Sequence, residues 1–170
     1  GVSGSGQTQF AIVRTGSYVD YGFGGFVYQR DGGVTIPAAG QAIYEGAYAG
    51  LRDFDGAGGL EFAQGDLQIR LDFGGFAGTC ASAGCETAVY GQVDNRRIFD
   101  AGGTDITQSV LDAIEAETGV PQSALPVLVF DIANTAADAN GELLGALDSN
   151  TADGEVYESG NYYAVMAGDH

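Results

Sequence analysis

The sequence has no lysine, no tryptophan and a single histidine, His170. Its six arginines stand against 23 acidic residues, so the chain of 170 residues carries a formal net charge of -17. Proteins that bind nucleic acid or anionic headgroups need cations to displace the counterions of the phosphates. The shortage of basic residues therefore argues against nucleic acid as a partner. It favours solubility and resistance to non-specific association.

Long hydrophobic runs are also missing. The most apolar segment, Leu125–Ala133, has nine residues, whereas a helix needs about 20 apolar residues to cross a bilayer. No transmembrane segment is predicted. The opening GVSGSGQTQ has no basic and apolar leader of the kind that forms a signal peptide. We expect residues 1–8 to be a flexible leader, or the start of a processed mature protein, and residues 9–170 to form a single domain.

Cysteine is scarce: only Cys80 and Cys85 occur, separated by four residues. A zinc site would need two more good ligands, and the C-x-x-C spacing of redox proteins is absent. We therefore predict a local disulfide, with two reduced surface thiols as the alternative. A disulfide would place the protein in an oxidising compartment.

Glycine is abundant, with 29 residues, whereas proline is rare, with 3. The segment Leu67–Phe73 alternates apolar and polar residues without a break, which is typical of an antiparallel wall with one dry face. Glycines within strands help a sheet to bend and close. We predict an antiparallel barrel of eight to ten strands, or alternatively a sandwich. The expected strands are Gln9–Arg14, Ser17–Arg30, Ile43–Arg52, Leu60–Ala63, Leu67–Phe73, Thr87–Asn95, Leu125–Ala133, Glu142–Leu147 and Tyr162–Ala167.

Turns are expected where small polar residues interrupt this pattern. Gln64-Gly65-Asp66 is predicted to be a turn, and Tyr157–Tyr162 a tight hairpin. The glycines inside Ser17–Arg30 indicate a bend or bulge.

One segment, Asp105–Glu117, has helical periodicity. Asp105 is expected to cap it, with Gln108 in the capping-box position, and Gly119 to end it. Its narrow apolar stripe predicts a helix that packs on the outside or covers one end of a barrel.

No catalytic constellation is found. His170 is the last residue, so a Ser-His-Asp or Cys-His mechanism has no base in place. Glu115 and Glu117 are two apart on a helix and face different directions. We therefore predict that the protein is not an enzyme.

No cofactor is predicted, although calcium and haem are weaker alternatives. Calcium would use acidic loops, but none matches a known loop motif, and turn chemistry explains them. Haem would use the cluster near the end of the chain, where half-buried strand tyrosines are the simpler interpretation. The calcium loops contain Asp53 and Asp55; Asp138, Asn140 and Glu142; and Asp148, Asn150 and Asp153, and the haem candidates are Tyr162, Tyr163, Met166 and His170.

Aromatic residues are the remaining candidates for a binding surface, because aromatics dominate interface hot spots. The alternative is that they are wall and core residues. The doublet Arg96-Arg97 is expected to form internal salt bridges in so acidic a chain. The aromatic candidates are Tyr18, Tyr21, Phe23, Phe26 and Tyr28, together with Tyr162 and Tyr163.

The segment Ile43–Arg96 contains YEGAYAGLRDFDGAGGLEFAQGDLQIRLDFGG and then AVYGQVDNR. It resembles the β-barrel domain of transferrin-binding-protein-B-like surface proteins of Gram-negative bacteria. The resemblance rests on glycine and aromatic spacing and on the strand with Val89, Gly91, Val93, Asn95 and Arg96. That family would usually continue into a further hydrophobic strand after MAGDH. The chain is therefore expected to be truncated, or its sheet to be one strand short.

The resemblance implies a non-enzymatic, secreted or lipid-anchored binding module at the outer-membrane surface. A protein partner or self-association is expected. The alternative is a structural subunit of an extracellular fibre or surface assembly, in which an open sheet edge accepts a strand of another chain.

Overall fold

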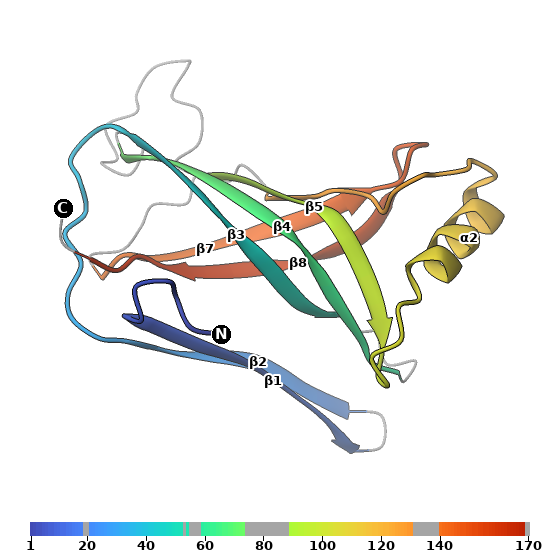
Figure 1. Ribbon diagram of the computed structural model, residues 1–170, viewed down its shortest axis with the longest axis horizontal. Helices are drawn as coiled ribbons and strands as arrows, with labels where there is room; N and C mark the ends of the chain where they lie inside the picture. Colours follow the sequence, from blue (N-terminus) through green and yellow to red (C-terminus); the bar gives the residue numbers. More distant parts are fainter. Residues whose placement is uncertain (19–20, 53, 55–58, 74–88, 131–139, 169–170) are drawn as a thin grey trace.

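The computed structural model describes residues 1–18, 21–52, 54, 59–73, 89–130 and 140–168, and within residues 14–24 only the backbone (Figure 1). The described part is mainly β, as predicted, with one α-helix. No helix among these residues is long and apolar enough to cross a membrane. The predicted disulfide between Cys80 and Cys85 lies outside the described residues.

Eight strands are present among the described residues. Most coincide with a segment of period-two hydrophobicity, because alternate side chains of a strand point to opposite faces of its sheet. The strands are β1 (Thr8–Tyr18), β2 (Tyr21–Arg30), β3 (Gln41–Arg52), β4 (Glu61–Asp72), β5 (Val89–Asp100), β6 (Leu128–Phe130), β7 (Glu142–Asn150) and β8 (Val156–Val165).

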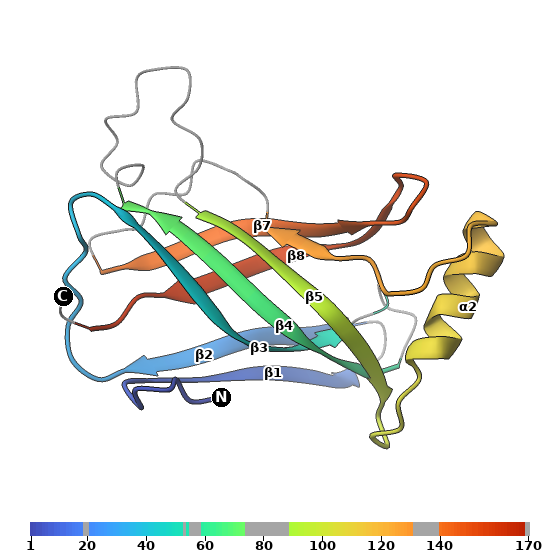
Figure 2. The ribbon, with the colours of Figure 1, turned by 45° about the horizontal axis from the view of Figure 1, so that its top comes forward.

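The strands form two sheets. Strands β3 to β8 make one six-stranded sheet in sequence order, in which every neighbouring pair is antiparallel. Figure 2 shows that this sheet curls, so that β3, β4 and β5 cross in front of β7 and β8. Strands β1 and β2 form a separate hairpin below it. The antiparallel prediction is confirmed, but the structure shows a half-barrel and a hairpin, not a closed barrel.

The core lies on the concave side of the curled sheet. Leu71 on β4 pairs with Val89 on β5, and both side chains are buried. Burying one such side chain stabilises the fold by roughly 1.5–3 kcal/mol. The cluster comprises Leu71, Phe73, Val89, Val93, Leu128, Phe130, Leu143 and Tyr162.

The helix α2 spans Thr107–Thr118, close to the predicted range, and ends at Gly119 in the left-handed conformation, as expected. The predicted capping box is wrong. Asp105 lies before the helix and accepts hydrogen bonds from the backbone N–H and hydroxyl of Thr107. Gln108 instead donates to Asp112. The chain prefers this local Asx-type turn because Asp105 also pairs with Arg97.

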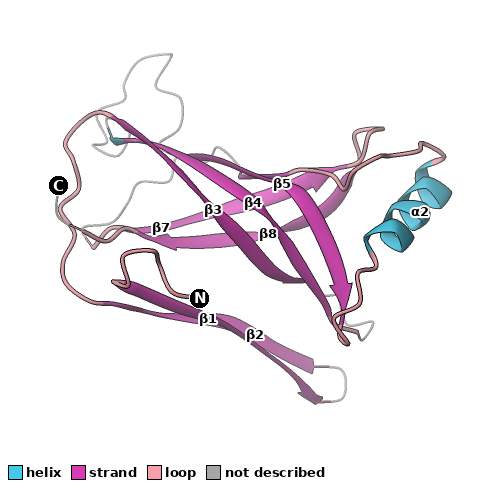
Figure 3. Cartoon of the chain, in the orientation of Figure 1, coloured by secondary structure: helices cyan, strands magenta, loops and turns pink. Residues whose placement is uncertain are grey.

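The helix covers one end of the half-barrel (Figure 3). Its buried residues Leu111 and Ile114 pack with Ala63, Ile98 and Leu125 in a second cluster. Leu111 and Ile114 belong to the narrow apolar stripe of the helix, together with Val110, which is partly buried against the same cluster. The prediction of a helix at a barrel end is therefore confirmed for the half-barrel that the structure shows.

Two predicted turns are wrong. Gln64-Gly65-Asp66 lies inside β4, which runs from Glu61 to Asp72, and Tyr157–Tyr162 lies inside the continuous strand β8. The glycines in both segments imitate turn signals, but pairing partners on either side keep them extended. Gly65 pairs with Tyr48, and Gly160 with Leu147.

Two strand boundaries also differ from prediction. Ser17 and Tyr18 belong to β1, not to the strand that follows. The register of the hairpin shifts between Thr15 and Tyr18, opposite Gly22, so the predicted irregularity at a glycine is present. Of the predicted strand Leu125–Ala133, only Leu128–Phe130 pairs as β6, and residues 131–133 lie outside the described part.

Candidate functional site: a groove with a charged end

A cavity of about 2290 Å³ lies between the hairpin and the concave side of the six-stranded sheet. Its walls come from both sheets and are rich in aromatic and aliphatic side chains. Among the described residues the hairpin forms no strand ladder with the sheet, so the cavity is open along its sides. We refer to it as the groove.

The hairpin presents one apolar face to the groove. Phe10 pairs with Tyr28 and Ile12 with Phe26, so these four side chains lie on the same face. All four line the groove and are between 38% and 48% exposed. The neighbouring Val13 and Val27 point to the other face and do not line the groove. The alternation of β1 and β2 therefore determines which residues face the cavity.

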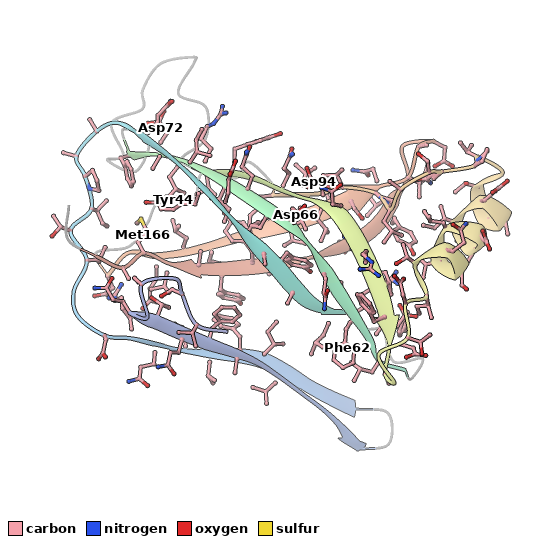
Figure 4. All side chains as sticks on the ribbon, in the orientation of Figure 1. Tyr44, Phe62, Asp66, Asp72, Asp94 and Met166 are labelled. Atoms are coloured by element: carbon pink, nitrogen blue, oxygen red, sulfur yellow. The ribbon has the colours of Figure 1, made fainter. Side chains whose placement is uncertain are left out.

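The sheet supplies the opposite wall. Tyr44 and Tyr48 of β3 line the groove, whereas Ile43, next to Tyr44, does not. Figure 4 shows Tyr44 on β3 and Met166 just after β8, two residues that both line the groove. Ile69, Phe130 and other core side chains form its floor. Tyr44 and Tyr48 are four residues apart on β3, so they share the face that lines the groove.

The hairpin is attached to the sheet near the ends of β7 and β8. Arg30 Nη1 donates to the carbonyls of Asn140, at 2.5 Å, and Met166, at 2.7 Å. The Tyr28 hydroxyl donates to Glu142. The rings of Phe26 and Tyr163 lie 4.2 Å apart between centroids. These contacts hold the base and middle of the hairpin beside β8.

A cluster of ion pairs lies inside the curled sheet at one end of the groove. Arg96 Nη1 pairs with Glu158 at 2.7 Å and also donates to the carbonyl of Pro126 at 2.7 Å. Arg52 pairs with Glu158 at 2.9 Å and with Glu61 at 2.6 Å. Its third nitrogen, Nη2, donates to the hydroxyl of Tyr157 at 2.8 Å. The two arginines and two glutamates balance in charge.

A β-bulge aims Arg96 into this cluster. Gln64 pairs with Arg97 and Asp66 with Asp94, so Asn95 and Arg96 together oppose Gly65. Asn95 has a positive φ of 48°, and its side chain donates to Asp66 at 2.8 Å. A Cβ atom at Gly65 would lie 2.8 Å from the Asp94 carbonyl oxygen. Glycine is therefore required opposite the bulge.

The cluster shifts the ionisation of its members. Burial would raise the pKa of Glu158, but the hydrogen bond and charge of Arg96, the charge of Arg52 and the Ser149 hydroxyl together lower it below 4.5. Burial would lower the pKa of Arg52, but Tyr157, Glu158 and Glu61 raise it. Burial raises the pKa of Tyr157. Glu158 and Arg52 are thus held in their charged, paired forms, and Tyr157 stays a neutral hydroxyl that accepts a hydrogen bond from Arg52.

The predicted salt bridges of Arg96 and Arg97 are confirmed. Arg96, whose side chain is 2% exposed, pairs inside with Glu158. Arg97 pairs outside with Asp105. Hydrogen bonds from Thr107, together with Arg97, lower the pKa of Asp105 to about 2.

The aromatic candidates divide between two places. Tyr162 is buried in the core beside Phe130, with ring centroids 4.7 Å apart, whereas Tyr163 is 54% exposed and contacts Phe26. Tyr18 pairs with Tyr21 in the backbone of the hairpin, and Phe23 pairs with Thr15. Their side chains lie outside the described part. The aromatic residues of the second strand that reach the groove are Phe26 and Tyr28.

Of the haem candidates, Tyr162 and Tyr163 both line the groove. Tyr162 and Tyr163 are neighbours on β8 and point to opposite faces. Met166 lines the groove, and His170 lies outside the described residues.

Of the calcium candidates that are described, Asn140 and Asp153 lie in turns, whereas Glu142, Asp148 and Asn150 belong to strand β7. Thr151 donates to Asp153 and to the carbonyl of Glu155, and Asn150 donates to Asp148 at 3.4 Å. Asp53, Asp55 and Asp138 lie outside the described residues. No group of three or more acidic, histidine or cysteine side chains that could hold a metal is found within the part of the chain that the structure describes.

The charged cluster was missed by sequence reasoning apart from Arg96. Arg52, Glu61 and Glu158 are far apart in the chain, and Glu158 lies in a segment predicted to be a hairpin. The available signal was the position of Arg52 at the end of an alternating strand, on the same face as Tyr44 and Tyr48.

Comparison with known proteins gives no further guide to the groove. No protein family, no curated protein and no solved structure matches this chain.

Proposed function

We propose that this protein is a non-enzymatic binding module that holds an extended segment of a protein partner in the groove. The observation that carries the proposal is the groove itself, with its two facing apolar and aromatic walls. The charged cluster at its end is internally paired, so it supplies a rigid boundary and no reactive group.

The size of the groove favours a polypeptide over a small molecule. Small-molecule sites usually enclose about 300–1,000 Å³, whereas this groove measures about 2290 Å³. Its apolar side chains alternate along the strands that line it, and an extended peptide presents side chains with the same period.

The charge of the chain favours a basic partner. The net charge is -17, and four of the six arginines are engaged in contacts within the chain, namely Arg30, Arg52, Arg96 and Arg97. A segment that combines apolar residues with arginine or lysine would be attracted by this field.

The architecture we propose for the complete wall is a barrel of eight strands, made of the six-stranded sheet and the hairpin. The curl of the sheet and the apolar groove-side face of the hairpin support it. The proposed location is the extracellular or outer-membrane surface of a Gram-negative bacterium. It rests on the resemblance of Ile43–Arg96 to transferrin-binding-protein-B-like barrels.

A peptide titration tests the proposal. The probe is a fluorescein-labelled octapeptide of alternating valine and arginine, and its binding is followed by fluorescence anisotropy. We expect Tyr44→Ala to weaken binding about tenfold, because an aromatic hot spot contributes about 1–2 kcal/mol. Binding should also weaken with added salt.

The matched control is the neighbouring residue. Ile43 is 56% exposed and does not line the groove, so Ile43→Ala should leave the affinity within about twofold. An alternating valine–glutamate peptide should not bind. Equal effects of the two alanine variants, or no binding of the basic peptide, would contradict the proposal.

A second candidate function is assembly by strand addition. The edges of β3 and β8 have no strand partner among the described residues, and Gln41–Leu51 contains one charged residue, Glu45. Natural edge strands are usually protected by charges, prolines or bulges. Light scattering after size-exclusion chromatography decides: concentration-dependent oligomers support assembly, and a monomer at all concentrations rules it out.

A further inference from the structure

The two edge strands of the six-stranded sheet, β3 and β8, are separated by a gap, and their directions limit which strands could fill it. All five pairings from β3 to β8 are antiparallel, so the two edge strands run in opposite directions. A single strand placed between them would be parallel to one edge. Two strands that are antiparallel to each other continue the pattern on both sides.

The chain contains such a pair. Strands β1 and β2 are antiparallel and have 11 and 10 residues, and the edges β3 and β8 have 12 and 10. The linker after β2, residues 31–40, leads directly into β3. This connection orders the closed wall as β8-β1-β2-β3, because consecutive strands usually neighbour each other. Closure must therefore also release the present contact of Phe26 on β2 with Tyr163 on β8.

The linker after β2 already contacts the segment just after β8. Val34 forms a parallel bridge with Gly168, just after β8, and the Thr35 N–H donates to the Gly168 carbonyl at 3.2 Å. The apolar face with Phe10, Ile12, Phe26 and Tyr28 is directed into the groove. That face would become the inner surface of the wall.

From these observations we infer that the β1–β2 hairpin is a built-in competitor for the groove, which swings about residues 31–40 to close the sheet into an eight-stranded barrel. A barrel of about eight strands has an interior that its own side chains fill. The closed state therefore excludes a peptide, and the partner binds the open state. The inference deepens the proposed function, on which its consequence for binding rests.

Amide hydrogen exchange followed by NMR tests the closure on the protein without any ligand. The readout is the set of β3 and β8 amides that point toward the gap. We expect them to be protected about tenfold or more, as a closed population of about 90% requires. Ile12→Asn should remove this protection, because it puts a polar group on the face that becomes the barrel interior.

Val13→Asn is the matched control. Val13 is 49% exposed and Ile12 48%, and they lie on opposite faces of β1. The control should retain the protection. The pair Phe26→Asn and Val27→Asn repeats the comparison on β2, in case a change in β1 unfolds the hairpin.

Three outcomes would overturn the inference. The gap-side amides exchange freely in the unaltered protein, or both members of each pair lose protection equally, or the protection grows with protein concentration and so comes from a second copy. Because no ligand is present, a failed peptide titration leaves this result unaffected, and the two proposals fail separately.

Discussion

At the scale of single residues, two of the six arginines are largely buried and paired with carboxylates. Arg96 and Arg52 are placed inside the curled sheet, around one carboxylate, Glu158. A buried ion pair adds little to stability compared with apolar packing, but removing one partner leaves an uncompensated charge. Through these contacts Glu158 on β8 is linked to β3 and β5, and it also accepts a hydrogen bond from Ser149 of β7.

Replacement of Glu158 should therefore be costly and pH-dependent. At neutral pH, Glu158→Gln is expected to lower the free energy of unfolding by about 3 kcal/mol or more. The pKa of Glu158 is lowered in the folded state, so its contribution is present above about pH 4.5 and is lost as the pH falls through the folded value. The difference between the variant and the unaltered protein should thus shrink in acid.

Urea unfolding at about pH 7 and about pH 3 measures this difference. Glu45→Gln is the control, because Glu45 is exposed on β3 and accepts a side-chain hydrogen bond from the exposed end of Gln68. It should change stability by no more than about 0.5 kcal/mol. A difference for Glu158→Gln that grew in acid would contradict the ionic role of the cluster.

At the scale of elements, the bulge between β4 and β5 positions the charged cluster. Gly65→Ala should destabilise the fold by about 1–3 kcal/mol, because the new methyl group would overlap the Asp94 carbonyl and Val93. Gly46→Ala on the neighbouring strand has open space around it. It should be neutral or slightly stabilising. Thermal unfolding of both variants checks the prediction, and equal midpoints would show that the bulge does not need glycine.

The sequence predicts strands and helices well where a hydrophobic pattern repeats, and poorly where the boundary of an element depends on a single residue. Period-two hydrophobicity located most strands, and Gly119 located the end of α2. The segments around Gly65 and Gly160 have the residue types of turns but lie within strands, because cross-strand pairing overrides local preference. Asp105 was expected to cap α2, yet its hydrogen bonds with Thr107 and Arg97 place it before the helix.

At the scale of the whole molecule, the curled sheet was predictable and the groove was not. The alternation and the glycines indicate a curved antiparallel wall, but they do not show where the two edges of the wall lie. Tyr44 and Phe26 line one cavity only because strands far apart in the chain face each other. The charged cluster depends on the same long-range arrangement, which is why most of it escaped prediction.

The central claim is that a gap between β3 and β8 leaves the concave side of the sheet open to the hairpin or to a partner. Cross-strand nuclear Overhauser contacts between backbone protons test it most directly. The account predicts contacts of β3 with β4 on one side and, on the other, with β2 or with no strand. Contacts between β3 and β8 would mean that the six strands close on themselves, with the hairpin outside, and would contradict the account.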